Sequence, residues 1–329
     1  MASHLLEVHD LSVDYITEAG FVRAVDRVEL TLGAGEFLAL VGESGCGKST
    51  LLFAIAQLLS PPAEVAAGSV IFKGRDMVTL GDEELRHARW RDYSVVMQSA
   101  MNALNPMKSI AAQFKDTMDA HSEMSAREIR ERSTEVLQLV GIDPVHLNSY
   151  PHQLSGGMRQ RAMIAMALLF TPDLVIMDEP TSALDVVAQR SLMSQIKELQ
   201  ERLGFAVIFV THDMSLVTHY SDRLAVMYGG QIAEASVTQL LFDQPLHPYS
   251  KGLLDAFPSI RGPRRVLTGI PGSPPDLARP PAGCRFQPRC PVAMPECATR
   301  EPDLYTVRAS LVRCLLYDPA IAAQRARAE

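Results

Sequence analysis

The sequence has no long apolar run. Its best candidate, residues 162–170, is about half of the roughly 20 residues needed to cross a bilayer, and Arg159 and Arg161 precede it. Any membrane role must therefore come through a partner. Residues 1–10 also lack a basic segment followed by an apolar stretch, which argues against a secretory signal and predicts a protein that stays in the cytoplasm.

Positive charge and cysteine are also scarce. The 329-residue chain has 31 Lys and Arg against 38 Asp and Glu, giving a formal net charge of -7 and a pI near 5.7. It has no basic field for a phosphate backbone, which argues against nucleic acid as the principal partner. Of five cysteines, only Cys46 lies outside the last fifth of the chain. In a reducing compartment this distribution favours metal binding over disulfides.

What is present is the ordinary mixture of a globular protein, with 47% apolar and 21% charged residues. Apolar runs at 37–41, 174–177 and 206–210 each precede a polar or glycine-rich turn and then a helical pattern. This alternation predicts an α/β fold with a buried parallel sheet covered by helices. Ligands of such sheets bind beyond the carboxyl ends of the strands, so the chemistry is expected just after these runs.

Composition also divides the chain, whose length suits two compact domains. Residues 107–170 are helical and charged, and we interpret them as a helical subdomain within a first domain of residues 1–240. Prolines gather after about residue 241 and break any long element. Residues 241–329 are therefore predicted to form a separate C-terminal extension that carries four cysteines.

The first chemical motif is Gly-Glu-Ser-Gly-Cys-Gly-Lys-Ser at residues 42–49, between an apolar strand and a helix expected to begin near Thr50. It matches the phosphate-binding loop, in which backbone N–H groups surround the phosphates of a nucleotide; a chance glycine turn is the alternative. Lys48 should reach the β- and γ-phosphates and the Ser49 hydroxyl should bind magnesium. The predicted nucleotide-binding residues are Gly42, Ser44, Gly45, Cys46, Gly47, Lys48, Ser49 and Thr50, with Cys46 an incidental small residue.

Two adjacent acids follow the apolar run at 174–177. Asp178 is predicted to hold magnesium through the coordination shell of the ion, and Glu179 is predicted to polarise the attacking water. A solvated pair at a strand end is the alternative for such a dipeptide alone. The two acids are expected at the same edge of the sheet as the phosphate loop, and this shared position favours the functional interpretation.

The family is indicated by Leu-Ser-Gly-Gly-Met-Arg-Gln at residues 154–160, which opens a helix shortly before the acidic strand. This segment resembles the signature of ATP-binding cassette (ABC) ATPases. Other marks of that family are Gln98, the loop at 182–185, and His212 after a strand. The resemblance covers roughly residues 5–240. It implies a P-loop ABC cassette with a RecA-like parallel sheet core, an antiparallel β subdomain and an α-helical signature subdomain.

The resemblance implies two cassettes stacked head to tail around ATP. Ser155, Gly156 and Gly157 are then expected to contact the γ-phosphate held by the other cassette's loop. Asp185 is expected to act across the dimer interface.

The resemblance also implies roles within one cassette. Glu179 would be the catalytic base, Gln98 would sense magnesium and the attacking water, and His212 would contact the γ-phosphate. Tyr15 matches the aromatic residue that stacks on adenine; a tyrosine packed on an edge strand is the alternative.

Three segments resemble the dipeptide and oligopeptide (peptide/nickel) importer branch. Residues 98–106 resemble its glutamine loop, which faces the membrane subunits, but Ser99 and Ala100 stand where that branch commonly has an acid and a proline. Residues 247–251 and 270–277 resemble segments of the branch's C-terminal region. The resemblance implies ATP hydrolysis that drives uptake of di- and oligopeptides. The alternative is an oligosaccharide importer of the same branch, because importers of that kind resemble this chain in having such a variant glutamine loop.

One cassette without a span needs partners. The resemblance implies a second cassette (a paralogue, or else a second copy), two membrane permease subunits and an extracytoplasmic substrate-binding protein, with the chain peripheral to the cytoplasmic face of the cell membrane. A soluble ABC ATPase is a weaker alternative, because only about 55 residues without sustained heptads separate Gln98 from the signature.

Successive cysteines of the extension are separated by five, six and sixteen residues, so none forms the two-residue knuckle of a structural zinc site. They are Cys284, Cys290, Cys297 and Cys314. Four thiolates suit an iron–sulfur cluster or zinc, with Arg285, Arg289 and Arg313 nearby to offset their charge. Members of the branch are similar in carrying a 4Fe-4S cluster here, which is the leading prediction. Zinc or free buried cysteines are the alternatives.

Overall fold

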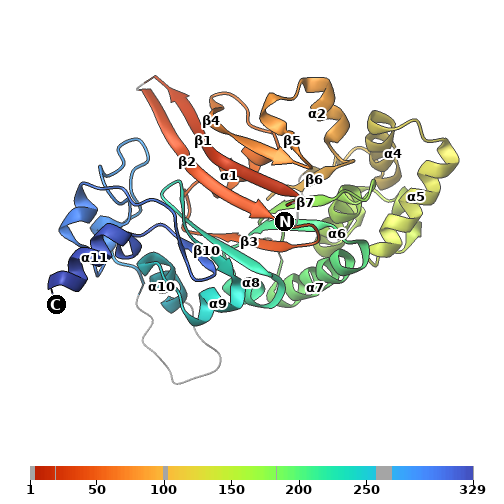
Figure 1. Cartoon of the computed structure of the whole chain (residues 1–329). Helices are drawn as coiled ribbons and strands as arrows, with labels where there is room; N and C mark the ends of the chain where they lie inside the picture. Colours follow the sequence, from red (N-terminus) through yellow and green to blue (C-terminus); the bar gives the residue numbers. More distant parts are fainter. Residues whose placement is uncertain (1–3, 19, 99–102, 183, 257–268, 329) are drawn as a thin grey trace. The chain divides into compact units, whose positions relative to one another are not determined.

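The computed structural model describes residues 4–18, 20–98, 103–182, 184–256 and 269–328 (Figure 1). The chain divides into two compact units. The first is formed mainly by residues 79–211, and the second by the described parts of residues 6–31, 38–78 and 212–329. Each unit is taken in turn below.

The first unit is built on parallel strands that pair in the order β6-β7-β8. They are β6 (Tyr93–Val96), β7 (Leu174–Asp178) and β8 (Ala206–Val210). Every residue of β7 and β8 is buried, as expected of parallel strands covered on both faces. The helices are α2 (Asp82–Ala88), α4 (Ile110–His121), α5 (Ala126–Leu139), α6 (Gly156–Ala167) and α7 (Val186–Leu203), with 3₁₀ turns at Pro144–Asn148 and Pro151–Gln153. A further 3₁₀ turn, Met77–Thr79, belongs to the second unit except for its last residue.

Side-chain caps determine where the helices of this unit begin. Ser125 and Glu128 form a capping box at the start of α5. The Oδ1 atom of Asp185 accepts from the backbone N–H groups of the second and third residues of α7, which ends at Gly204 with a φ of 80°. Helix α5 contacts both α4 and α6, so the segment predicted to be helical forms a packed group of helices (Figure 1).

The second unit contains a four-stranded sheet in the order β2-β1-β4-β5 (Figure 1). Its strands are β1 (Leu6–Thr17), β2 (Gly20–Leu32), β4 (Ala63–Phe72) and β5 (Arg75–Asp76). Strand β4 runs antiparallel to both β1 and β5. This part of the unit agrees with the predicted antiparallel β subdomain.

A second run of strands in this unit has the order β11-β12-β10-β9-β3. The strands are β3 (Phe37–Val41), β9 (Arg223–Tyr228), β10 (Gln231–Val237), β11 (Tyr305–Val307) and β12 (Ser310–Val312). The β3–β9 pair is parallel and the other pairs are antiparallel. Residues 305–312 therefore add a hairpin to β10, which the sequence analysis did not predict. Its two-residue turn places Arg308 at a φ of 56°.

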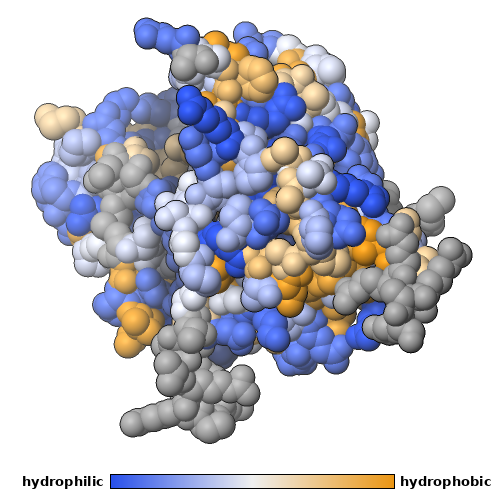
Figure 2. Space-filling model, turned by 90° about the vertical axis from the view of Figure 1, so that its left-hand side faces the viewer, coloured by the Kyte–Doolittle hydropathy of each residue, from blue (hydrophilic) through white to orange (hydrophobic). Residues whose placement is uncertain are grey.

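Helices of the second unit are short. They are α1 (Lys48–Ile55), α8 (Met214–Tyr220), α9 (Thr238–Asp243), α10 (Pro248–Asp255) and α11 (Pro319–Ala328), with 3₁₀ turns at Gln287–Arg289, Pro295–Ala298 and Leu315–Tyr317. Within the described ranges, no helix combines the length and apolarity that crossing a membrane requires. On the face drawn in Figure 2, hydrophilic and hydrophobic residues are mixed in small groups.

The strands predicted from apolar runs are confirmed. The runs at 37–41 and 206–210 coincide with β3 and β8, and β7 extends one residue beyond the predicted run to include Asp178. Helix α1 begins at Lys48, two residues before the predicted start, because the left-handed Gly47 is its N-cap. The motif residues therefore lie at strand ends and helix starts, where ligand-binding residues were expected.

Candidate functional site

The phosphate-binding loop joins β3 to α1 and requires glycine at two positions. Gly42 and Gly47 have φ values of 155° and 103°. An added Cβ would lie 2.1 Å from the Met227 carbonyl oxygen at Gly42, and 2.3 Å from the Ala24 carbonyl oxygen at Gly47. Only glycine avoids both the unfavourable φ and the collision. The loop backbone can therefore pass against the neighbouring strands.

Lys48 lies over this loop. Its side chain is in a residue only 6% exposed, and Nζ donates to the carbonyl oxygens of Gly42 at 2.8 Å and Glu43 at 3.0 Å. Cys46 is buried beside it, and burial raises the pKa of its thiol, which favours the neutral form. Ser44 and Gly45 are exposed at the tip of the loop. The tip of the loop is thus exposed to solvent, and the Lys48 ammonium group is held against the backbone at the start of the loop.

Tyr15 and Thr50, two predicted nucleotide-binding residues, lie in contact. The Tyr15 hydroxyl and the Thr50 hydroxyl are 3.2 Å apart, which connects β1 to the first turn of α1. Ser49 precedes Thr50 in that turn and is partly exposed. The structure therefore places Tyr15 beside the phosphate loop; stacking on adenine stays a prediction.

In the first unit, β7 delivers the two predicted acids to one end of the strand. Asp178 is buried, with 3% of the residue exposed. Glu179 has a left-handed φ of 47°, uncommon for a non-glycine residue, and its N–H donates to the Val210 carbonyl oxygen at 3.0 Å. The Gln98 amide nitrogen donates to Glu179 Oε2 at 2.6 Å. Two predicted catalytic residues, 81 positions apart in the sequence, are thus brought together.

The signature segment forms the start of α6. The Ser155 hydroxyl accepts from the Met158 N–H at 3.2 Å, which makes it the N-cap, and Gly156 and Gly157 form the first turn. A Cβ added at Gly157 would meet no atom within 4 Å, so this helix terminus is open. Gln160 is buried and donates to the Pro180 carbonyl oxygen, which joins the signature helix to the residue after Glu179. The sequence analysis quoted Gln160 in the motif but did not predict this contact.

Two further predicted site residues lie on the surface. Asp185 is exposed and caps α7, accepting from the N–H groups of Val187 at 3.0 Å and Ala188 at 2.9 Å. His212 is exposed just before α8, whose N-cap is Asp213. Ser99 and Ala100, the departure from the peptide-importer loop, lie outside the described residues.

The four cysteines at residues 284–314 line one small cavity together with Phe286. They are Cys284, Cys290, Cys297 and Cys314, and none forms a disulfide. The cavity volume is about 10 Å³, room for no more than about one water molecule. Burial raises the pKa of Cys284 to about 11 and that of Cys314 to about 12. Across the described ranges, no group of three or more His, Cys, Asp or Glu side chains could hold a metal ion.

The arginines next to these cysteines were expected to offset thiolate charge, but their hydrogen bonds go elsewhere. Arg285 donates to the Asp26 carboxylate and to the Gly229 carbonyl oxygen. Arg289 forms two hydrogen bonds with the Glu43 carboxylate, at 2.6 and 2.9 Å. Arg313 donates to backbone carbonyl oxygens, among them that of residue 27 at 3.2 Å. All three therefore connect the extension to β2 or to the loops at the ends of β3 and β9.

Known proteins resemble the chain along almost its entire length. A family model described as ABC transporter matches residues 25–182, and one described as oligopeptide/dipeptide transporter, C-terminal region, matches residues 233–297. The dipeptide transport ATP-binding protein DppD of Caldanaerobacter subterraneus is 41% identical over 319 residues, 96% of this chain and 98% of that protein. The chain belongs to the ABC transporter ATP-binding protein family.

Other members of the ABC family give the same result. DppD of Bacillus subtilis is 44% identical over 95% of both chains, and the oligopeptide transport protein OppD of the same organism is 41% identical over 93% of this chain and 86% of its own. A solved dimeric ATP-binding cassette, bound to ADP and Pi in a post-hydrolysis state, covers 71% of this chain and 98% of its own with 28% identity and a TM-score of 0.64. The chain has the ABC ATPase cassette fold and is an ABC transporter ATPase, an enzyme that couples ATP hydrolysis to transport.

Proposed function

We propose that the chain is the ATP-hydrolysing subunit of an importer for dipeptides and oligopeptides. The observation that carries the proposal is 41–44% identity over nearly the whole chain to proteins named for dipeptide or oligopeptide transport. The match at residues 233–297 adds weight, because it lies mostly beyond the part that the ABC transporter model matches. We divide the chain into a cassette of residues 1–240 and an extension of residues 241–329.

Nucleotide binding is assigned to the phosphate loop and its neighbours. Lys48 and the loop N–H groups bind the β- and γ-phosphates, and Tyr15 stacks on adenine. The Ser49 hydroxyl and the Asp178 carboxylate provide the oxygen ligands that magnesium prefers. Bound magnesium would neutralise phosphate charge during hydrolysis.

Glu179 is assigned as the base that accepts a proton from the attacking water. The hydrogen bond from Gln98 supports this role, because it holds the carboxylate in one orientation and connects it to the sensor residue. His212 is assigned to the γ-phosphate.

The active assembly is proposed to contain two cassettes. Ser155, Gly156, Gly157 and Asp185 then complete the ATP site of the partner, for which the open start of α6 is suited. Two similar solved cassettes are described as dimeric. Because no described helix can cross a membrane, uptake needs two permease subunits, and an importer of this type also needs an extracytoplasmic binding protein. The ATPase would lie on the cytoplasmic face of the membrane.

We also propose that the four cysteines of the extension hold a 4Fe-4S cluster. The four thiols line one cavity and are the usual ligand set of such a cluster. In the described metal-free arrangement they do not form a group that could hold a metal ion, so the proposal requires the cavity wall to open and the four side chains to rearrange. The thiols must lose protons to bind metal, which their raised pKa values oppose in the metal-free state. Anaerobic purification followed by iron, sulfide and zinc analysis tests this. Protein without iron and sulfide, whether it holds zinc instead or has every thiol titratable, would contradict it.

The transport function is tested with the complex of this chain, its membrane subunits and its binding protein. ATP hydrolysis is measured with dipeptides, longer peptides or oligosaccharides on the binding protein. Stimulation by peptides supports the proposal. Stimulation by oligosaccharides alone would make the complex a sugar importer, and no stimulation by either would favour the soluble ATPase.

A further inference from the structure

Glu43, in the phosphate loop, is held by the C-terminal extension. Arg289 Nη1 donates to Glu43 Oε2 at 2.6 Å, and Nη2 donates to Oε1 at 2.9 Å, so guanidinium and carboxylate meet in a two-pronged pair. The Glu43 N–H donates to the Tyr249 hydroxyl at 2.9 Å. Both the side chain and the backbone of this loop residue thus bind residues more than 200 positions away.

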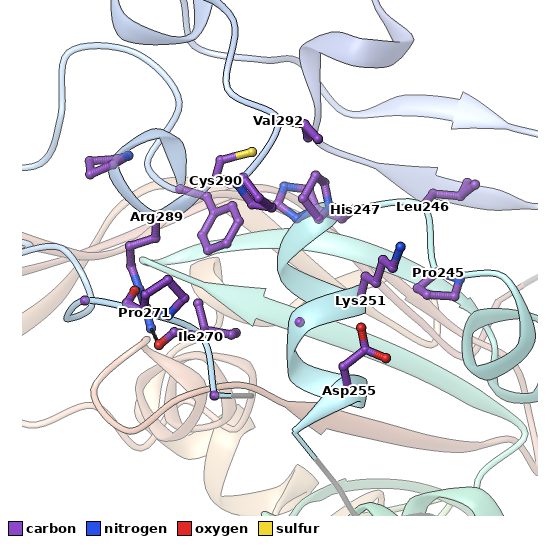
Figure 3. Close-up of a pocket in the computed structure, with 17 residues that line it drawn as sticks. Pro245, Leu246, His247, Lys251, Asp255, Ile270, Pro271, Arg289, Cys290 and Val292 are labelled. Atoms are coloured by element: carbon purple, nitrogen blue, oxygen red, sulfur yellow. Dashed lines mark hydrogen bonds between the residues drawn. The ribbon is translucent and has the colours of Figure 1, made fainter. Parts of the chain in front are cut away.

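Arg289 is itself fixed in place. Its side chain is 5% exposed, and Nε donates to the Pro271 carbonyl oxygen at 2.8 Å. The guanidinium lies 5.7 Å from the centre of the Tyr228 ring. Figure 3 shows Arg289 beside Ile270 and Pro271, across a cavity of about 670 Å³ from helix α10. A side chain held on several sides can impose its position on Glu43.

Tyr249 is equally constrained. The residue is fully buried in α10, and its ring centre lies 4.4 Å from that of Tyr228 and 5.5 Å from that of Phe286. Its hydroxyl group therefore approaches the loop from a rigid aromatic cluster. Arg289 and Tyr249 reach the same loop residue from two different segments of the extension.

Charge makes this contact relevant to ATP. Glu43 lies in the loop assigned to the phosphates of ATP, and an uncompensated carboxylate there would repel them. Arg289 removes most of that repulsion and leaves the loop N–H groups to act on the phosphates. The loop backbone also depends on Glu43, because the Glu43 carbonyl oxygen accepts from Lys48 Nζ at 3.0 Å.

We propose that Arg289 is a positioning residue for ATP binding: through the Glu43 carboxylate it neutralises and orients the phosphate loop, so that the C-terminal extension forms part of the ATP-binding apparatus. Tyr249 supports Glu43 as well, because its hydroxyl group accepts from the Glu43 backbone N–H. The inference rests on the proposed function of the loop.

The test compares ATP hydrolysis and ATP binding in the full transporter complex for Arg289→Gln, Glu43→Gln and the double variant. Arg289→Gln should raise KM and Kd for ATP about tenfold with a much smaller change in kcat, because a partly buried carboxylate loses its partner in the phosphate loop. The double variant should return both constants to within about threefold of wild type, because no lone charge remains. Arg308→Gln is the matched control, since Arg308 is exposed in the same extension and donates to Gln244.

Two outcomes would overturn the inference. One is equal KM values for Arg289→Gln, Arg308→Gln and wild type; the other is a double variant as poor as Arg289→Gln, which would mean a merely structural loss. If Arg289→Gln does not fold, Tyr249→Phe removes one hydroxyl group and should weaken ATP binding about threefold. Unchanged binding there would also contradict the inference. Lys48→Ala separates the two proposals: if it binds ATP normally, the loop assignment itself fails.

Discussion

The phosphate loop and the cysteine-bearing extension are held in place by different forces. In the loop, Lys48 bonds to carbonyl oxygens at most six positions away, and glycines let the backbone touch β2 and β9; Glu43 is the loop residue that the extension holds. The extension consists of short elements, and among its described residues one small apolar cluster near the cysteines has Cys297, Leu315 and Ile321 as its buried members. It is fastened instead by buried arginines.

This difference shows how an extension with little core can have a defined position. The three arginines each follow or precede a cysteine, and each finds a carboxylate or carbonyl partner at the cassette strands and loops. Buried charges must be paired, which makes their positions specific. Changes to the loop, or to Arg289 that holds Glu43 in it, should therefore affect ATP binding, whereas changes to Arg285, which binds Asp26, should first affect stability.

The largest expected effect is on the rate of ATP hydrolysis and comes from Glu179, the assigned catalytic base. Glu179→Gln should lower kcat for ATP hydrolysis about a thousandfold while ATP binding persists, because the amide cannot accept the proton of water. The variant should accumulate as an ATP-bound dimer, visible by size-exclusion chromatography. Glu198→Gln, on the exposed face of α7, is the control and should behave as wild type. Wild-type turnover in Glu179→Gln would remove Glu179 from its role.

Breaking an anchor should affect stability. Arg285→Gln leaves the Asp26 carboxylate, whose side chain is only 7% exposed, without its closest cation and should lower the free energy of unfolding by about 3 kcal/mol. Chemical denaturation measures this. The double variant with Asp26→Asn should recover a large part of the loss, and Arg308→Gln should cost little. An Arg285→Gln protein as stable as wild type would mean that this pair is no anchor.

Acid should loosen the extension through His247, the N-cap of α10, whose Nδ1 accepts from the Tyr249 N–H at 3.0 Å. Burial lowers its pKa from 6.5 to about 4, so between these values the unfolded chain binds a proton that the folded protein does not. Stability is therefore lost as pH falls through this window, by up to about 3 kcal/mol.

This prediction is tested by comparing the wild type with His247→Asn, in which the asparagine side chain can still cap the helix. It should flatten the dependence of unfolding free energy on pH between 6.5 and about 4. The neighbouring Glu234, which accepts from the His247 N–H, titrates in both proteins and so cancels in the difference. Parallel curves for the two proteins would show that His247 does not titrate as described.

The smallest expected effect is the difference in stability between alanine substitutions at two glycines of the loop, Gly45 and Gly47. Gly45→Ala meets no atom within 4 Å and carries only the cost of a φ of 77°, about 1 kcal/mol. Gly47→Ala adds a Cβ 2.3 Å from the Ala24 carbonyl oxygen and should cost about 2 kcal/mol more. Thermal unfolding of the pair measures the difference. Equal destabilisation would mean that the loop does not need close contact with β2.

Local signals account for what the sequence predicted. Strands β3, β7 and β8 were read from buried apolar runs, and the glycines of the loop from a motif whose backbone demands them. The family resemblance gave Gln98 and Glu179 separate roles toward the attacking water, and the structure brings the two side chains into contact, which the sequence analysis did not predict.

The rest depends on pairs that no local pattern marks. Glu43 and Arg289 are 246 positions apart, so neither spacing nor periodicity connects them. The hairpin of β11 and β12 consists of strands of three residues each, too short for an alternating pattern to stand out. The arginines beside the cysteines were assigned by sequence proximity, whereas their side chains reach toward the cassette strands and loops.

Uptake of a labelled peptide tests the central claim most directly. Vesicles that contain the membrane subunits and this chain, with ATP on the side of the chain and a peptide-loaded binding protein on the other, are compared for the wild type and Lys48→Ala. The account predicts accumulation of peptide that needs ATP and is absent in Lys48→Ala. Accumulation that is equal in the two proteins, or none in the wild type while ATP is still hydrolysed, would contradict it.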